Sequence, residues 1–290
     1  EKDTLMPVID KLDSDDGYEG AIVFDPIPEV LYEALAVKDY SSLYPSSIIQ
    51  KNMSHETMVR SSDYDELSDV KYYNAQYKQS DGTVKHVRFA KKDDKLGVVP
   101  MILDTLLKER RAVKKQMKTE NDTFKYKILD AKQLALKITA NSLYGQLGAP
   151  TSPVFLKAIA ACTTSTGREM LIFAKKYDEE ILPGFINGLK YAYKKNNMKM
   201  VNKILDMELK DRNNDKLIEQ MKTYVTKKLD GYIFQPVIRY GDTDSVFTCF
   251  RFKEECRKIS KKDGLDIWKN TPPWQRAYVL RKIADLMREK

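Results

Sequence analysis

Three aspartates stand where strand-like runs of the sequence end. Asp39 follows one apolar run, and Asp242 and Asp244 lie between two others. Carboxylates delivered to the end of a sheet can bind a hard divalent cation through oxygen. Aspartate is also common in ordinary β-turns, because its side chain hydrogen-bonds the local backbone. Taken alone, the string Gly241-Asp242-Thr243-Asp244 therefore predicts only a hairpin turn with acids at its tip.

A second group of residues joins a cation to amide and aromatic side chains at helical spacing. Lys137, Asn141 and Tyr144 stand at i, i+4 and i+7, which places them on one helix face. Such a face suits a phosphate, the edge of a base pair and a stacked base. Arg110 and Lys114 are also four residues apart, but by themselves they are better explained as the solvated face of a helix.

The residues that follow Asp39 are suited to an anion. Ser42, Leu43 and Tyr44 come where the strand gives way to a helix with Pro45 in its first turn. The first N–H groups of a helix have no acceptor within it, so this junction can receive the tail of a triphosphate.

Three strings together resemble the motifs of the family B DNA polymerases in residue type, spacing and order. They are DYSSLYPS (39–46), KITANSLYG (137–145) and YGDTDS (240–245), and LLKERRAVK (106–114) matches a pattern of the same family's fingers. The resemblance covers roughly residues 17–252. Any one motif can arise by chance, but three long ones in order rarely do.

The resemblance implies a phosphoryl-transfer site that uses two Mg²⁺ ions, for which Mn²⁺ can substitute. Asp39 and Asp244 would bridge the ions, and the backbone carbonyl of Tyr40 would add a further oxygen. Asp242 matches a catalytic acid of the family that supports the site less directly. A turn-capping role remains the alternative for Asp242.

The resemblance also implies which residues hold the substrates. Tyr44 resembles a steric gate that leaves no space for a 2′-hydroxyl, although a lone tyrosine is more often a packing residue. The residues implied to contact the incoming nucleotide are Ser42, Leu43, Tyr44, Arg110, Lys114, Lys137 and Asn141, with the three cations on its triphosphate. The residues implied to contact DNA are Tyr18, Gly20, Tyr144, Gly145, Tyr240 and Thr243.

Two departures from the family pattern indicate a subgroup. Ser47 stands where the family usually has isoleucine, and residues 189–230 predict an insertion between the second and third motifs. Both features resemble the polymerases of large double-stranded DNA viruses of eukaryotes. Thr166-Gly167-Arg168 also resembles part of a family helix behind the second motif, where a packing role explains it at least as well.

Apolar periodicity predicts the elements that position these groups. Pro183-Gly184 should end a helix over 155–180, and a helical stretch over 189–229 should break at Asn213-Asn214. We further expect strands over 34–40, 232–240 and 246–252, a β-hairpin over 70–89 with its turn at 80–82, an antiparallel pair of helices from Pro100 to about 118 and over 123–144, and a helix over 273–289.

The fold class implied by the resemblance is α+β. An antiparallel palm sheet with packed helices would carry Asp39 and Asp244, and an antiparallel helical hairpin would form the inserted fingers. Residues 1–97 and 149–290 would be the two parts of the palm, and 98–148 the fingers. Exonuclease and thumb domains are absent from the sequence, so we expect this fragment alone to be weakly active or inactive.

Length and composition limit the classes of protein to which the chain can belong. The chain has 290 residues, 42% hydrophobic and 32% charged, which excludes a disordered or fibrous protein. The net charge of +8 is unevenly spread, because residues 1–36 carry ten acids and two lysines whereas 107–137 carry ten basic and four acidic residues. Three cysteines without a Cys-x-x-Cys pair, and two histidines, favour neither disulfides nor zinc. Apolar runs are too short to span a membrane.

The function implied is template-directed addition of dNTPs to a primer 3′ end in DNA replication. Primer–template DNA and a processivity factor would be partners, inside the cell, in the nucleus or at a cytoplasmic replication site. A reverse transcriptase would place two aspartates side by side, whereas Thr243 separates them here. The main alternative is a catalytically silent relative that only binds DNA or acts as a scaffold. A basic helical nucleic-acid binder with chance motifs is a third reading.

Overall fold

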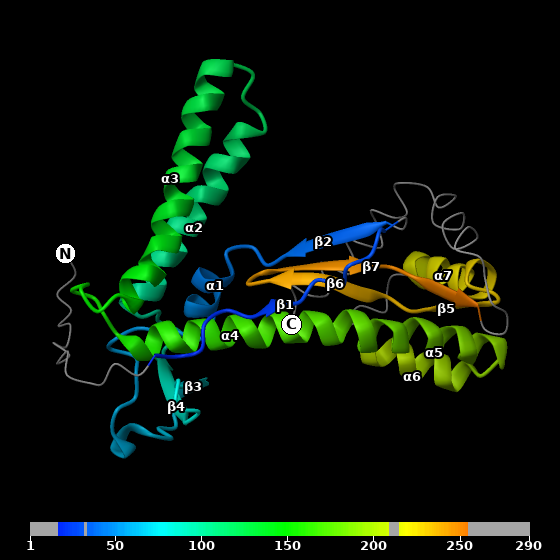
Figure 1. Cartoon of the computed structure of the whole chain (residues 1–290), viewed down its shortest axis with the longest axis horizontal. Helices are drawn as coiled ribbons and strands as arrows, with labels where there is room; N and C mark the ends of the chain where they lie inside the picture. The colour runs from blue at the N-terminus through cyan, green and yellow to red at the C-terminus, as the bar shows by residue number, and fades with distance from the viewer. Residues whose placement is uncertain (1–16, 32–33, 209–214, 255–290) are drawn as a thin grey trace. The chain divides into compact units, whose positions relative to one another are not determined.

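The computed structural model describes residues 17–31, 34–208 and 215–254, and the chain divides into two compact units. The first unit contains Tyr40–Glu169 and the described part of Glu1–Ile22. The second contains Val23–Asp39 and the described part of Met170–Lys290. Helices and antiparallel sheets occur together (Figure 1), so the coarse α+β class is confirmed.

A four-stranded antiparallel sheet forms the centre of the second unit. Its strands lie in the order β1-β6-β7-β2 and comprise Val23–Phe24, Val237–Asp242, Ser245–Cys249 and Leu35–Asp39. A separate two-stranded sheet pairs β5 (Tyr232–Phe234) with β8 (Phe252–Glu254). The strands predicted over 232–240 and 246–252 are therefore each split in two. Pro236, which cannot donate to a sheet ladder, lies at the first of these breaks.

The strand predicted over 34–40 is confirmed as β2, and its two faces differ. Ala36 and Lys38 are half-buried on one face, while Val37 and Asp39 are exposed on the other. Ala36 packs against an apolar cluster that includes Tyr177 and Leu182 of the helical segment on that face. Because side chains alternate along a strand, Asp39 necessarily lies on the face away from this cluster.

The helix predicted to end at Pro183-Gly184 continues instead. Helix α4 (Lys157–Lys176) leads through a π-helical turn, η2 (Tyr177–Ile181), into α5 (Leu182–Lys194). Pro183 stands in the first turn of α5, directly after the π-helical turn, and the first turn of a helix tolerates proline. The prediction failed because proline is compatible with a helix start as well as with a helix end.

The stretch predicted as an insertion, 189–230, has an apolar core of its own. Helices α6 (Met198–Glu208) and α7 (Asp215–Thr223) and the π-helical turn η3 (Tyr224–Lys228) follow α5. The predicted break at 213–214 lies outside the described residues, and a break within them occurs at 195–197. The core residues of this cluster are Leu189, Ala192, Val201, Leu205, Val225 and Leu229.

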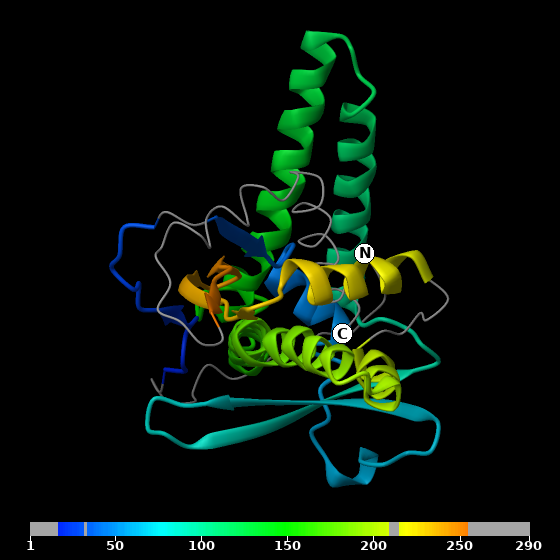
Figure 2. The same ribbon diagram turned by 90° about the vertical axis from the view of Figure 1, so that its right-hand side faces the viewer.

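The first unit confirms both predicted hairpins (Figures 1 and 2). Strands β3 (Val70–Lys78) and β4 (Val84–Lys92) join through a turn in which Gly82 has φ +89°. Helices α2 (Val98–Met117) and α3 (Thr123–Gly148) pack as an antiparallel pair. Asp122 caps α3 by accepting the N–H groups of Phe124 and Lys125. The base of the pair packs on α1 (Leu43–Gln50).

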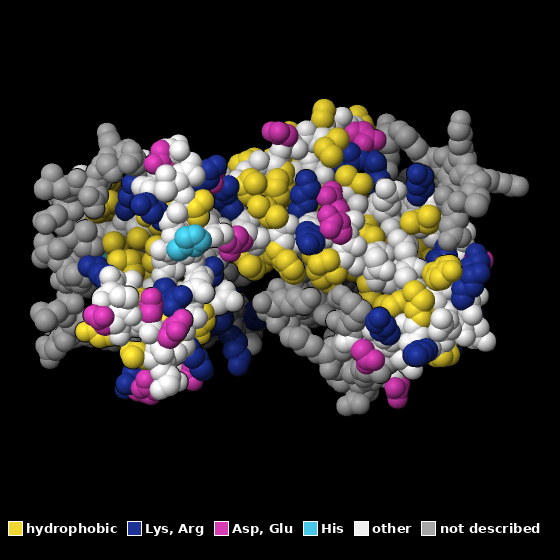
Figure 3. All heavy atoms as spheres, turned by 90° about the horizontal axis from the view of Figure 1, so that it is seen from below, with side chains coloured by type: hydrophobic (Ala, Val, Ile, Leu, Met, Phe, Trp, Pro, Cys, Tyr) yellow, Lys and Arg dark blue, Asp and Glu magenta, His cyan; other side chains and the backbone are white. Residues whose placement is uncertain are grey.

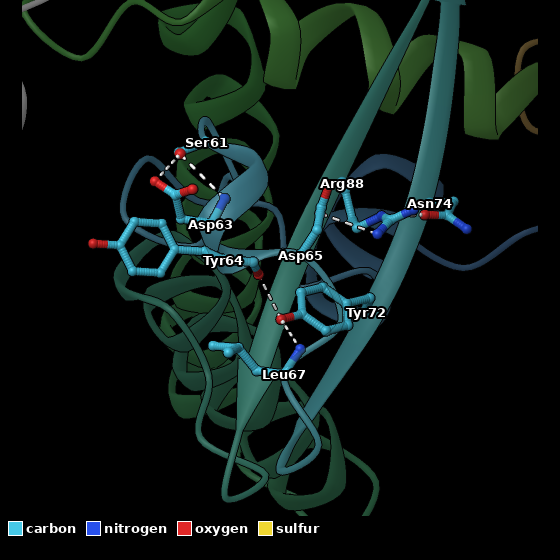
Figure 4. A network of polar contacts seen from close by, with 8 residues as sticks. All are labelled: Ser61, Asp63, Tyr64, Asp65, Leu67, Tyr72, Asn74 and Arg88. Atoms are coloured by element: carbon cyan, nitrogen blue, oxygen red, sulfur yellow. Dashed lines mark hydrogen bonds and ion pairs between the residues drawn. The ribbon is translucent and has the colours of Figure 1, made fainter.

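The loop that precedes β3 is fastened to the β-hairpin by side chains (Figure 4). Tyr72 donates its hydroxyl hydrogen to the Tyr64 carbonyl at 2.6 Å and accepts the N–H of Leu67 at 3.1 Å. Arg88 bonds Asp65 Oδ1 at 3.0 Å and lies over the Tyr72 ring. The short η1 turn (Ser62–Tyr64) is thereby held against the hairpin.

The helix predicted over 273–289 also lies outside the described residues, as does Cys256. Among the helices that the structure describes, none combines the length and the apolar character needed to cross a membrane.

Candidate functional site

Antiparallel pairing brings the three aspartates to one end of the four-stranded sheet. Asp39 at the end of β2 pairs with Ser245, the first residue of β7. Asp242 at the end of β6 pairs with the same Ser245 from the other side. Thr243 and Asp244 form the two-residue turn between β6 and β7. Asp39 and the turn therefore flank Ser245, and β2 and β6, the strands on either side of β7, lie about 10 Å apart.

The turn before Asp244 is strained at Thr243 but defined by a hydrogen bond. Thr243 has φ +51°, a left-handed value that costs a β-branched residue about 1–3 kcal/mol. The N–H of Asp244 donates to the Asp242 carbonyl across it. Such strain persists where surrounding contacts impose it, here the paired strands on either side of the turn.

Hydroxyl groups engage the side chain of Asp242. Thr243 donates to Oδ1 at 2.8 Å and Tyr240 donates to Oδ2 at 3.3 Å. Burial and the Asp242 carboxylate raise the pKa of Tyr240, so its hydroxyl stays protonated and able to donate. The side chain of Asp242 is thus held by hydrogen bonds at the start of the turn and is half-buried, whereas the side chain of Asp39 is exposed.

A buried ion pair lies on the other face of β2, and sequence reasoning missed it. Lys38 Nζ contacts Asp178 Oδ2, which also accepts the hydroxyl of Thr248 on β7. Burial lowers the pKa of Lys38, and the Asp178 carboxylate opposes that shift. A lysine in an apolar run was the available signal. Its partner, 140 residues away in η2, had none.

The donor set at this end of the sheet suits a hard cation that substrate helps to hold. Among the described residues, no group of three or more His, Cys, Asp or Glu side chains could hold a metal by itself. Mg²⁺, however, is commonly bound by one or two carboxylates together with substrate phosphates and water. Asp39 and Asp244 offer that number of carboxylates, so the residues fit the ion that the sequence implies.

In the first unit, the predicted anion-binding junction forms the start of α1. Ser42 is the residue before the helix, with φ 53° and ψ 53°, and its carbonyl accepts the N–H of Ser46 at 2.9 Å. Leu43 is buried and Tyr44 half-buried. The backbone at 42–44 thus turns sharply into the helix.

Three predicted site tyrosines from separate segments of the first unit gather together. The rings of Tyr44 and Tyr144 lie 4.6 Å apart at 48°. Tyr144 is hydrogen-bonded to Tyr18, and burial, reinforced by that bond, strongly raises the pKa of Tyr144. Gly20 and Gly145 are open: among the described residues, no atom lies within 4 Å of a Cβ built on either glycine.

The predicted nucleotide-contacting residues of the helical pair lie along α2 and α3. Arg110 Nε donates to Gln133 Oε1 at 3.2 Å, which fixes the level at which the two helices meet. The two helices are antiparallel, so Lys114 lies one turn from Arg110 toward the loop that joins them. Lys137 lies one turn from Gln133 in the opposite direction, away from that loop. Lys114, Lys137 and Asn141 are exposed.

Sequence reasoning also missed an ion pair that fastens the Tyr18 segment to α4. Arg168 NH1 contacts Glu19 Oε2, and Thr164 donates to the Glu19 carbonyl at 3.3 Å. The Arg168 hydrogen bond holds the pKa of Glu19 below its usual value. The sequence singles out Tyr18 and Gly20 as well as Thr166-Gly167-Arg168, but nothing in it pairs the two segments.

Comparison with known proteins identifies the family. The sequence model of the family described as DNA polymerase family B matches residues 1–263 of this chain. A DNA polymerase of Phaeocystis pouchetii virus is 34% identical over 91% of this chain and 25% of its own length. The DNA polymerase delta catalytic subunit of Drosophila melanogaster is 34% identical over 87% of this chain and 19% of its own. The predicted resemblance to viral members is confirmed, and it extends to a cellular enzyme.

Structural comparison finds a family B DNA polymerase from the archaeon Pyrobaculum calidifontis, with 25% identity and a TM-score of 0.45 over 86% of this chain and 23% of that chain. This chain spans about a quarter or less of the length of these relatives. The match over residues 1–263 covers most of the 290 residues. The chain belongs to DNA polymerase family B.

Proposed function

We propose that this chain forms the palm and fingers of a template-directed DNA polymerase that adds dNTPs to a primer 3′ end in DNA replication. The observation that carries the proposal is the strand register that sets Asp39 and the Asp244 turn on either side of Ser245, in a chain of this family. Residues 1–97 and 149–290 are assigned to the palm and 98–148 to the fingers.

Asp39 and Asp244, with the Tyr40 carbonyl, would hold two Mg²⁺ ions or Mn²⁺ in their place. These ions would supply the positive charge that stabilises the attacking and leaving oxygens of phosphoryl transfer. Asp242 keeps the turn in shape through its bonds to Thr243 and Tyr240. The paired strands hold the carboxylates in place before substrate binds, which limits reorganisation during the reaction.

Residues of the first unit are assigned to the substrates. The backbone at Ser42 and Leu43 and the side chains of Arg110, Lys114 and Lys137 would hold the triphosphate, since arginine and lysine pair well with phosphate oxygens. Asn141 would contact the new base pair, and Tyr44 would exclude ribonucleotides. The residues assigned to DNA are Tyr18, Gly20, Tyr144, Gly145, Tyr240 and Thr243, and a processivity factor is a further proposed partner.

Two alternative functions would give different results in a primer-extension assay. A reverse transcriptase would copy RNA, and a silent relative would bind DNA without extending a primer. The separation of the turn aspartates by Thr243 disfavours the first, and the presence of both Asp39 and Asp244 disfavours the second.

The test is extension of a labelled primer by the full-length protein with one dNTP at a time. We expect addition only of the dNTP complementary to the template base, with the accepted dNTP changing when that base changes, and no addition when EDTA removes the metal. Efficient copying of an RNA template would favour the reverse transcriptase. DNA binding with no extension under Mg²⁺ or Mn²⁺ would favour the silent relative.

A further inference from the structure

We propose that Gly167 is a specificity-determining position. Its lack of a side chain lets the Tyr44 ring lie directly against α4, and this fixes the space left for the sugar of the incoming nucleotide. The inference rests on the proposed function, in which Tyr44 is the steric gate. Gly167 acts through Tyr44 and is a positioning residue.

The contact between Gly167 and the ring is too close for any side chain. A Cβ built on Gly167 would lie 2.9 Å from Cε1 of Tyr44 and 3.5 Å from its Cδ1. It would also lie 3.4 Å from Cδ2 of Leu43. Carbon atoms in contact normally stay about 3.5–4.0 Å apart. Alanine at 167 would therefore force the ring edge to move.

Glycine in the interior of α4 also calls for a packing reason. Glycine is the least favourable residue in a helix interior after proline, and α4 runs without a break from Lys157 to Lys176. The close approach of the Tyr44 ring supplies that reason. Two other helical glycines, Gly145 and Gly184, have no atom of the described residues within 4 Å of a built Cβ, so close contact is not general.

Contacts to other segments of the same unit hold the helix around Gly167 in place. Thr163 is buried and donates its hydroxyl to the sulfur of buried Met53 at 3.6 Å. Thr164 and Arg168 both bind Glu19, one through its carbonyl and the other through its carboxylate. A new methyl group at 167 would therefore displace Tyr44 more readily than α4.

The ring is confined on its other side as well. Tyr144 on α3 lies 4.6 Å away, centroid to centroid, and its hydrogen bond to Tyr18 keeps it in place. The Tyr44 ring therefore has few alternative positions, and the position that Gly167 permits becomes the one that meets the sugar. Because a misplacement of about 1 Å can cost about a hundredfold in rate, a smaller displacement of the ring should still change substrate binding measurably.

The experiment is a double-mutant cycle in the full-length protein, with Gly167→Ala, Tyr44→Ala and the double variant. The kcat and KM for single-nucleotide addition are measured for the complementary dNTP and rNTP. With Tyr44 present, we expect Gly167→Ala to raise the KM for dNTP about fivefold or more, with a smaller change in kcat. With alanine at 44, the same substitution should change KM by less than about twofold, because no ring meets the new methyl.

Gly184→Ala on α5, where a Cβ meets open space, is the matched control for glycine replacement in a helix. Equal effects of Gly167→Ala in both backgrounds, or an unchanged KM beside Tyr44, would overturn the proposal. If Gly167→Ala alone fails to fold, recovery of folding in the double variant supports it, and failure of both overturns it. Unchanged sugar selectivity in Tyr44→Ala would instead overturn the gate itself.

Discussion

Tyr44 lies half-buried between an aromatic ring on α3 and a glycine on α4, not free on the surface. The sequence alone allowed two roles for it, a steric gate and a packing residue. The structure shows that packing fixes the ring in one place, which a gate requires. The two roles are therefore compatible in this chain.

Tyr44→Ala should increase ribonucleotide incorporation, because the ring that would meet the 2′-hydroxyl is removed. We expect the preference for dNTP over rNTP, measured as the ratio of kcat/KM values, to fall about tenfold or more, or roughly 1.4 kcal/mol. Tyr126→Ala is the control, since Tyr126 is exposed on the same unit's α3. A preference that stays at the wild-type value would show that Tyr44 does not select the sugar.

Single residues with chemical function could be predicted from the sequence only where they belong to a local string. Asp39, Asp242 and Asp244 were found in this way, and the structure places them at one end of a sheet. Lys38 lies in the apolar run that ends at Asp39, and Glu19 lies between Tyr18 and Gly20. Their partners Asp178 and Arg168, however, lie 140 and 149 residues away. Long-range pairs of this kind leave no spacing for a sequence to show.

At the scale of elements, periodicity predicted the strand before Asp39 and both hairpins, because alternation and helical repeats record which face is buried. It failed at prolines. Pro183 begins a helix rather than ending one, and Pro236 stands at a break in a strand predicted to run through it. The π-helical turn at 177–181 also has no sequence signal, although it carries Asp178 to the sheet.

Asp178→Ala should strongly destabilise the protein. Its side chain is fully buried, and that of Lys38 is only 11% exposed, so the substitution leaves a buried cation unpaired. Breaking such a pair costs about 3–5 kcal/mol in the free energy of unfolding, measured by urea denaturation. The double variant Lys38→Met/Asp178→Leu should recover most of this loss, because both charges are removed together.

The exposed pair between Lys222 and Glu219, 3.3 Å apart, is the matched control. Glu219→Ala should change the free energy of unfolding by no more than about 1 kcal/mol, because water screens exposed ion pairs. Equal effects of Asp178→Ala and Glu219→Ala would contradict a structural role for the buried pair.

Among the described residues, no group donates a hydrogen bond to Oδ1 of Asp178. The carboxylate is therefore held through Oδ2 alone, by Lys38 and Thr248.

At the scale of the whole molecule, the charge of individual segments is more informative than the net charge of the chain. The ten basic residues of 107–137 lie on α2 and α3 and the loop between them. On the face shown in Figure 3, by contrast, lysine and arginine alternate with aspartate and glutamate over each unit. A surface of mixed charge does not favour binding of a polyanion such as DNA. The basic pair of helices α2 and α3 does favour such binding.

The central claim is that Asp39 and Asp244 bind the metals that support nucleotide addition. Its most direct test is single-turnover primer extension by Asp39→Asn and Asp244→Asn in the full-length protein under Mg²⁺, with DNA binding measured in parallel. Asp230→Asn, at an exposed position of the same unit, is the control. We predict a rate loss of about a hundredfold or more in both variants, with DNA affinity retained. Extension by either variant at close to the wild-type rate would contradict the claim.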